Sequence, residues 1–199
     1  MPGLISPSRA HPHAVNHASL AAAAAIIDQG GIVAYPTEFC YGLGCDPRRN
    51  STIRRLLRLK RRSRDLGLIV VGAHIGALSR YFLSLEASQM RRVEATWPGP
   101  VTWLLPAHPS VSPWVSGTHG TVAVRVTAHP AAAALCKHAH RALISTSANR
   151  HGRAPARSAA EVIRQFGEEV DYVLTGRLGG FHAPTEIRDA VTDTVIRAA

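Results

Sequence analysis

A run of hydrogen-bonding side chains follows a short apolar segment in the second half of the sequence. Ser145, Thr146, Ser147 and Asn149 place four such side chains, together with several backbone amides, within five residues. Donors and acceptors gathered in this way can hold phosphate oxygens or a ribose. A helix cap or a plain turn uses the same residue types, and the segment taken alone favours that simpler interpretation.

Arg125 stands inside an apolar segment, between Val124 and Val126. In a strand its side chain leaves on the face opposite to those two valines, and an arginine on a nearly buried strand requires an anionic partner. A structural Asp or Glu is the simpler partner. Because no acidic residue occurs from residue 95 to residue 160, a ligand carboxylate or phosphate is the alternative.

Arginines dominate the charge of the chain. Lys and Arg total 23 against 13 Asp and Glu, a formal net charge of +10, and only Lys60 and Lys137 are lysines. Residues 48–64 contain nine cations and no acid. Such a cluster repels itself unless an anion meets it, and guanidinium groups bind phosphate or carboxylate with two hydrogen bonds. The cluster as a whole predicts a phosphate-bearing ligand, although a solvated basic helix face accounts equally well for its outer arginines.

Common nucleotide-binding and hydrolytic motifs are absent from the sequence. There is no GxxxxGK[ST] loop, and no GxGxxG turn lies between a strand and a helix, so a nucleotide would have to be held differently. Neither GxSxG nor HExxH is found. The spacing of the histidines does not indicate a zinc site, so no metal ligand is expected.

The elements that must position these residues alternate along the chain. The expected strands are 31–36, 66–72, 101–106, 120–127, 142–146, 171–176 and 190–197, with a loop after residue 36. The expected helices are 14–29, a basic helix capped by Asn50, 77–82, 86–95, 131–139 and 158–166, the last capped by Ser158. Strands interleaved with helices predict an α/β fold: a single domain with a twisted, mixed, open sheet flanked by helices.

The polar clusters lie at the ends of these expected strands. Thr37 follows the first strand, residues 60–64 precede the second, and the Ser- and Thr-rich run follows residues 142–144. Open α/β sheets bind ligands at strand ends, so we expect these residues and Arg125 to share one positive cavity.

Length and composition limit the class of protein. The 199 residues are those of one domain, and 46% apolar with 18% charged residues exclude wholesale disorder. Residues 1–13, with three prolines, are expected to form a flexible tail before a domain at 14–199. There is no apolar stretch of about 18 residues, no secretory leader and no CxxC pair, so we expect a soluble, cytoplasmic protein without membrane contact.

Six segments, taken in order, resemble one family. They are YPTEFCYGLGCDP (35–47), LKRR (59–62), WPGPVTWLLP (97–106), VAVRVTAHP (122–130), ISTSAN (144–149) and APTEIRDA (183–190). Together they are similar to the YrdC/TsaC family, the L-threonylcarbamoyladenylate synthases, in its short single-domain form. The resemblance covers nearly everything after residue 13 and implies a YrdC-like catalytic domain over 14–199.

The resemblance implies a reaction that composition does not indicate. L-Threonine, bicarbonate or CO2, and ATP form threonylcarbamoyl-AMP and pyrophosphate, for the threonylcarbamoyl (t6A) modification of tRNA adenosine 37. Mg2+ is expected with ATP because it bridges phosphate oxygens, and no residue is assigned to it. Beyond the substrates, the implied partners are the threonylcarbamoyl-transfer proteins of tRNA modification, with tRNA itself a further candidate.

The resemblance also assigns roles to individual residues. The catalytic group is Lys60, Arg62 and Arg125. The threonine site is Thr37, Arg125, Ser145 and Thr185. The ATP site is Lys60, Arg62, Arg64, Thr121, Ser147, Asn149, Pro155 and Arg197. Ser63, Leu66 and His151 depart from the family pattern beside the nucleotide site, and Arg64 is expected to supply the charge missing at residue 66.

Two other functions are compatible with the charge. A basic module that binds tRNA or double-stranded RNA without catalysis would use the same arginines on phosphates. Only 6% of residues are aromatic, however, and no interleaved basic and aromatic stripe is present for stacking bases. Another ATP-dependent carbamoyl or adenylyl transferase on the same scaffold would differ only in its acceptor.

Overall fold

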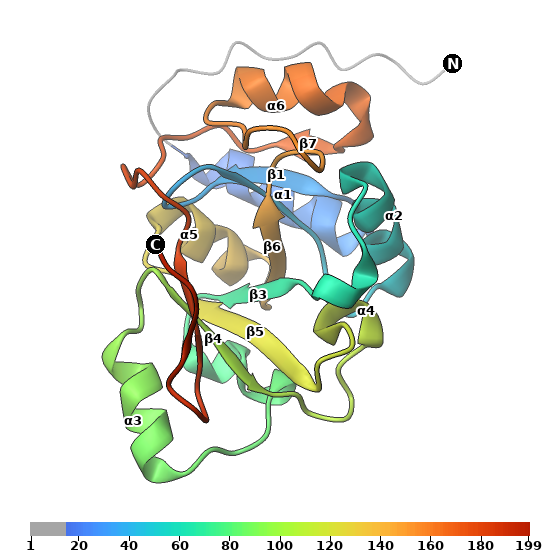
Figure 1. Ribbon diagram of the computed structural model, residues 1–199. Helices are drawn as coiled ribbons and strands as arrows, with labels where there is room; N and C mark the ends of the chain where they lie inside the picture. Colours follow the sequence, from blue (N-terminus) through green and yellow to red (C-terminus); the bar gives the residue numbers. More distant parts are fainter. Residues whose placement is uncertain (1–14) are drawn as a thin grey trace.

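A mixed sheet runs through the molecule in the computed structural model, which describes residues 15–199 (Figure 1). Within those residues the strands are β1 (Val33–Pro36), β2 (Tyr41–Gly44), β3 (Ile69–Gly72), β4 (Val101–Pro106), β5 (Thr121–Val126), β6 (Leu143–Ser147), β7 (Tyr172–Val173), β8 (Glu186–Asp189) and β9 (Val195–Arg197). Their order across the sheet is β7-β1-β2-β6-β3-β5-β4-β8-β9. Three neighbouring pairs, β1 with β7, β3 with β5 and β4 with β8, are parallel and the others antiparallel. The predicted α/β fold with a mixed sheet is confirmed; the tail predicted for residues 1–13 lies outside the described residues.

Helices flank this sheet. They are α1 (His17–Asp28), α2 (Asn50–Lys60), α3 (Ala87–Ala95), α4 (Pro113–Ser116), α5 (Pro130–His138) and α6 (Ala159–Phe166), with single 3-10 turns η1 (Arg64–Leu66), η2 (Ile75–Ala77), η3 (Ser79–Tyr81) and η4 (Gly167–Glu169). The predicted cap of α6 is confirmed, because the Ser158 hydroxyl accepts a hydrogen bond from the Glu161 amide at 3.2 Å. The predicted cap of α2 is wrong. Arg49 holds the cap position without a side-chain bond, and Asn50 accepts instead from the Ser112 hydroxyl at 2.6 Å, which ties α2 to α4.

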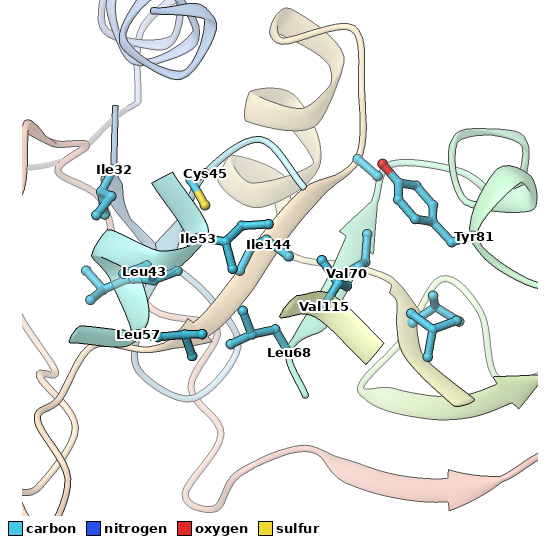
Figure 2. Close-up of a cluster of buried hydrophobic side chains, with 14 of the residues drawn as sticks. Ile32, Leu43, Cys45, Ile53, Leu57, Leu68, Val70, Tyr81, Val115 and Ile144 are labelled. Atoms are coloured by element: carbon cyan, nitrogen blue, oxygen red, sulfur yellow. The ribbon is translucent and has the colours of Figure 1, made fainter. Parts of the chain in front are cut away.

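The core has two layers because successive strand residues point to opposite faces of the sheet. Val33 and Tyr35 of β1 pack with α1 and α5 on one face. Ala34, Val70 and Ile144 belong to the cluster on the other face, under α2 and α6. Figure 2 shows part of this second cluster, with the α2 side chains directed onto β2, β3 and β6. The two layers fix the sheet rigidly between helices, which is what a binding cavity at its strand ends requires.

Two strands escaped the sequence prediction. β2 lies where a loop was expected, and its sequence YGLG lacks the alternation of apolar and polar residues that marks a strand. β8, with the sequence EIRD, is charged and half-buried along its length. Two 3-10 turns, η2 and η3, replace the helix expected at 77–82. Of the strand expected at 190–197, only Val195–Arg197 forms a strand, β9.

No helix among residues 15–199 combines the length and the apolar character needed to cross a membrane.

Candidate functional site

A cavity of about 610 Å3 opens between β5, the end of β6, and the β8–β9 hairpin. It is closed at one side by η1 and at the other by the turn between β1 and β2. Nine of the predicted site residues line it: Thr37, Arg62, Thr121, Arg125, Ser145, Ser147, Pro155, Thr185 and Arg197. These residues span most of the sequence, so the expected convergence on one hollow is a property of the fold. Lys60, Arg64 and Asn149 do not line it.

Thr37 is held at the mouth of the β1–β2 turn. Its hydroxyl and its amide both donate to the Cys40 carbonyl, at 2.7 and 3.1 Å. The side chain is buried, and its hydroxyl oxygen keeps lone pairs that can accept a hydrogen bond from a ligand. Ser145 and Ser147 lie across from this turn because β2 pairs antiparallel with β6, with Gly42 opposite Ser147.

Arg125 is held by an acid distant in the sequence. One guanidinium nitrogen, Nη2, donates to Glu38 Oε2 at 3.2 Å, and the other, Nη1, donates to Thr185 Oγ1 at 2.7 Å. Thr127 donates to the second oxygen of Glu38 at 2.7 Å. The simpler interpretation of Arg125 is therefore correct for one edge of its guanidinium. Among the described residues its Nε has no partner and is buried, but other parts of the residue line the cavity, so Arg125 also borders the space a ligand would occupy.

Arg62 and Arg197 make the far wall of the cavity positive. Arg62 donates to the Gly67 carbonyl at 3.1 Å, and its Nε is buried without a partner. Arg197 donates to the Thr185 carbonyl at 2.6 Å. Burial lowers the pKa of both side chains, as do neighbouring charges, Arg197 acting on Arg62 and Arg125 on Arg197. Among the described residues neither forms an ion pair with a carboxylate, so an anion in the cavity would supply the missing counter-charge.

Lys60 is buried and does not belong to the lining of the cavity. Its Nζ donates to the backbone carbonyls of Ser147 and Asn149, the second at 2.8 Å. Burial, followed by the charge of Arg62, lowers the pKa of Lys60 to about 8. The Asn149 side chain is likewise occupied, accepting from the Ser147 hydroxyl at 2.6 Å and donating to the Arg153 carbonyl at 2.8 Å. Both residues were predicted to contact ATP, but they lie outside the cavity lining and hydrogen-bond with the end of β6 and the loop that follows it.

The rest of the basic cluster spreads around α2. Arg64 packs over the Trp114 ring at 5.4 Å and lies beside Asp65 at 3.7 Å, exposed to solvent and outside the cavity. Arg54 packs against the same ring at 5.8 Å, and Arg55 pairs with Asp171. Of the nine cations in residues 48–64, only Arg62 lines the cavity. The expectation of one phosphate ligand for the whole cluster is therefore wrong, because a helix distributes its side chains around its axis.

The sequence predictions omitted Glu38 and, apart from Leu66, which was placed beside the nucleotide site, the apolar residues of the lining. Glu38 follows Thr37 in the sequence and is buried. An acidic residue next to a predicted site residue is only a weak indication that it belongs to the site. Phe39, Leu66, Leu104 and Ile196 line the cavity, and Leu66 and Ile196 are more than half exposed. Such residues look like ordinary apolar positions in the sequence. The cavity therefore combines an apolar wall with cations and hydroxyls, which suits a ligand with both an apolar group and several negative charges.

Nothing in the described part of the chain gathers three potential metal ligands. The lining holds one carboxylate among the described residues, Asp189, whose Oδ1 accepts from the Val191 and Thr192 amides at 2.9 Å. This donor set does not form a metal cage of its own. It is compatible with a cation that arrives on a polyphosphate and keeps most of its water.

Comparison with known proteins extends this description. A family model for Sua5/YciO/YrdC domains, described as "Telomere recombination", matches residues 25–199. A threonylcarbamoyl-AMP synthase from Nitrosococcus oceani is 53% identical over 175 residues, covering 88% of this chain and 95% of the relative. Another protein of that name, from Halorhodospira halophila, is 50% identical over 191 residues, covering 96% and 97%.

A solved structure with the same fold belongs to the family that the sequence relatives indicate. The crystal structure of P. abyssi Sua5 complexed with L-threonine superimposes with a TM-score of 0.81 at 29% identity, over 85% of this chain. This chain spans 50% of that longer protein. The family match covers the sheet, the cavity and every predicted site residue. The chain thus belongs to the Sua5/YciO/YrdC family.

Proposed function

We propose that this chain is an L-threonylcarbamoyladenylate synthase. It joins L-threonine, bicarbonate or CO2, and ATP into threonylcarbamoyl-AMP with release of pyrophosphate. The observation that carries the proposal is the cavity in which Arg62, Arg125 and Arg197 meet hydroxyl groups beside an apolar wall. Relatives named for this activity, about half identical over nearly their whole length, support it.

The reaction needs charge neutralisation more than a nucleophile supplied by the protein. The threonine amine adds to CO2 and loses a proton, giving a carbamate. A carbamate oxygen then attacks the α-phosphorus of ATP, and the bond to the bridging oxygen of the β-phosphate breaks as pyrophosphate leaves. Fixed cations and dipoles aimed at the developing charge can each lower the barrier by several kcal/mol. Holding the three reactants in line contributes on a similar scale.

The cavity offers a place for each charge. Arg125 would hold the threonine carboxylate, with Thr37, Ser145 and Thr185 as hydroxyl partners of the bound threonine. Arg62 and Arg197 would meet the polyphosphate, and Thr121, Ser147 and Pro155 would hold the nucleoside. Lys60 would act as a positioning residue through the carbonyls of the loop after β6. Mg2+ bound to the nucleotide would supply charge neutralisation at the phosphate oxygens, and Asp189 is the carboxylate that the described lining could offer it.

The product would serve the threonylcarbamoyl modification of tRNA adenosine 37 in the cytoplasm. A mixed anhydride of a carbamate and a phosphate hydrolyses readily, so it would pass to threonylcarbamoyl-transfer proteins. Direct contact with tRNA would use arginines outside the cavity. The alternative of a non-catalytic RNA-binding module is not favoured, because the relatives over most of the chain are named as synthases.

The test follows pyrophosphate release from ATP, Mg2+ and bicarbonate with L-threonine added or withheld. We expect release only when both threonine and bicarbonate are present. Thr37→Val removes a hydroxyl from the cavity and keeps the side-chain shape, so kcat/KM for threonine should fall about ten-fold, the size of one lost hydrogen bond.

Thr102→Val is the matched control. Thr102 is fully buried in β4, outside the cavity, and its hydroxyl has no partner. This variant should keep wild-type activity. Pyrophosphate release that ignores threonine would indicate a transferase with another acceptor, and no release under any condition would leave only a binding function.

A further inference from the structure

A second cavity, of about 500 Å3, lies at the other ends of β3 and β6 from the first. β3 and β6 are antiparallel neighbours, with Ile69 opposite Ser145 and Val71 opposite Leu143 (Figure 1). The first cavity is lined by the start of β3 and the end of β6. The second is lined by residues just after β3 and just before β6, together with the end of α5 and the turns η2 and η3. The same two strands therefore separate the two cavities.

Cations converge on this second cavity. Its lining includes Arg48, Arg80, Lys137 and Arg141, with His74 and His140 between them. Four other lining residues have small side chains or none: Ala73, Gly76, Ala77 and Ala142. They leave space for a ligand between the charged side chains. These cations come from three separate stretches of the sequence, and the fold brings them together.

Two of the guanidinium groups are held in place by a buried acid. Asp46 is 1% exposed, and its Oδ2 accepts from both Arg48 Nη2 and Arg141 Nη1 at 2.8 Å. Arg141 Nη2 also pairs with Asp28 at 2.9 Å. Burial opposes ionisation of Asp46, yet the Arg48 hydrogen bonds and the charge of Arg141 leave its pKa below the usual range. Each guanidinium has five N–H groups, and Arg48 Nη1 and Arg141 Nε have no partner among residues 15–199, so both can donate to a ligand.

The other two cations are uncompensated. Within residues 15–199, neither Arg80 nor Lys137 lies within ion-pair distance of a carboxylate, and both are exposed. Two carboxylates thus serve four cations. Tyr81 adds a neutral donor, since burial raises the pKa of its hydroxyl. Figure 2 shows the Tyr81 ring at one side of the apolar cluster.

We propose that this second cavity binds a small polyphosphate anion, such as free pyrophosphate or the phosphate chain of a nucleotide. Its volume lies within the range of about 300–1,000 Å3 typical of small-molecule sites. Pre-positioned guanidinium groups that keep free N–H donors suit the several oxygens of a polyphosphate. RNA is the less suitable occupant, because the cations line a hollow rather than an extended surface, and the described lining contains no Phe or Trp and a single Tyr for stacking bases. The inference goes beyond the proposed function and does not rest on it.

The test maps binding on the intact protein by amide chemical shifts in NMR spectra. Pyrophosphate, ATP and a short RNA duplex are titrated separately at fixed salt, because salt screens exposed charges. We expect pyrophosphate, ATP or both to shift the amides of Gly76, Ala77 and Ala142, independently of any shift at Gly42 and Ser147 in the first cavity. A response to both compounds identifies the polyphosphate chain as the ligand group, and a response to ATP alone identifies a nucleotide.

A double variant, Arg80→Ala with Lys137→Ala, removes the two uncompensated cations. Both side chains are exposed and outside the core, so the fold should persist. The affinity at the second cavity should fall about ten-fold or more, a loss of about 1.4 kcal/mol. The matched control is Arg91→Ala with Arg164→Ala, which removes two exposed cations from α3 and α6, outside both cavities, and should leave the affinity unchanged.

The proposal is overturned if pyrophosphate and ATP leave the amides around Gly76 unshifted. It is equally overturned if the double variant binds as tightly as the wild type, or if only the RNA duplex shifts these amides. Each of these results is independent of whether the protein makes threonylcarbamoyl-AMP.

Discussion

At the scale of single residues, the cavity depends on how its charges are compensated. Arg125 is 5% exposed and shares Glu38 with Thr127, so one edge of its guanidinium is neutralised inside the protein. Removing Arg125 would leave Glu38 as an unpaired buried carboxylate, which costs stability by itself, typically about 3–5 kcal/mol. A loss of activity in Arg125→Ala could thus arise either from lower stability of the fold or from weaker substrate binding, and the activity alone would not separate the two. Thr37→Val avoids this problem because it removes no charge.

Lys60 provides a pH-dependent prediction at the same scale. Its pKa falls from an ordinary value of 10.5 to about 8 in the folded protein, first because it is buried and second because Arg62 is near. Below pH 8 both the folded and the unfolded states carry the proton, and burial of the ammonium group opposes folding. Between about 8 and 10.5 the folded state loses the proton while the unfolded state keeps it. The Lys60 contribution to stability should therefore rise with pH across that window, by at most about 1.4 kcal/mol per pH unit.

The measurement compares wild type with Lys60→Met by urea unfolding on both sides of that window. The difference between the two proteins removes the titration of tyrosines and cysteines, which is common to both. Since the chain has only two lysines, labelling lysine with 13C at Cε gives two signals, and Lys137→Arg identifies the Lys60 signal. A Lys60 signal that titrates near 10.5 would refute the prediction.

At the scale of elements, the hairpin of β1 and β2 positions both Thr37 and Glu38. Tyr41 pairs with Pro36 and Gly44 with Val33, so the turn between them has a fixed register. β2 contains two glycines because its neighbours come close. A Cβ atom at Gly44 would lie 2.6 Å from Tyr35 Cε1 and 2.7 Å from the Ile144 carbonyl oxygen. The backbone of β2 can approach β6 only without a side chain at that position.

Gly44→Ala should therefore lower the free energy of unfolding by about 1–3 kcal/mol, as overpacking in a core does. Chemical denaturation of the variant and the wild type measures the difference. Gly76→Ala is the control, because the nearest atom to its added Cβ is His74 Nδ1 at 3.2 Å, which belongs to a side chain and not to the backbone. A Gly44 variant as stable as the Gly76 variant would mean that the hairpin tolerates displacement from β6.

At the scale of the whole molecule, one sheet carries two positive cavities, which lie at opposite ends of β3 and β6. The net charge of +10 is therefore organised rather than spread evenly. Acids distant in the sequence neutralise many arginines, as Glu38 does for Arg125 and Glu169 for Arg150. Both cavities combine cations of the two kinds: Arg125, Arg48 and Arg141 are paired with carboxylates, whereas Arg62, Arg197 and Arg80 have no carboxylate partner among the described residues. This pattern keeps the fold stable while leaving charge available for ligands.

Ligand binding to the first cavity should be visible as thermal stabilisation of the whole domain. A ligand present at about a hundred times its Kd stabilises the folded state by about 2.7 kcal/mol. For a domain of this size, that corresponds to a rise in Tm of about 5–10 °C. We expect L-threonine with ATP and Mg2+ to raise Tm, as measured by differential scanning calorimetry. L-Valine, which replaces the threonine hydroxyl with a methyl group, should have a much smaller effect; equal shifts would remove the hydroxyl partners Thr37 and Ser145 from the threonine site.

The sequence by itself determined the α/β class, most of the strands and helices, and the family. Apolar runs such as VAVRV and VTWLLP are long enough for their local pattern to predict a strand, and Ser158 has the local spacing of a cap. β2 and β8 were not predictable in this way. Their residues become strands because neighbouring backbones supply hydrogen bonds, which no local pattern records.

Only the tertiary structure decided which charged residues meet. The stretch 95–160 contains no acid, so Glu38, which is 87 residues away in sequence, could not be identified as the partner of Arg125. In the same way, residues close in sequence lie in different surroundings. Lys60 donates to the Asn149 carbonyl, Arg62 lines the cavity, and Arg64 packs on the Trp114 ring. Side-chain direction depends on the position around a helix and on the packing of distant elements, and charge interactions depend on distance in space rather than along the chain.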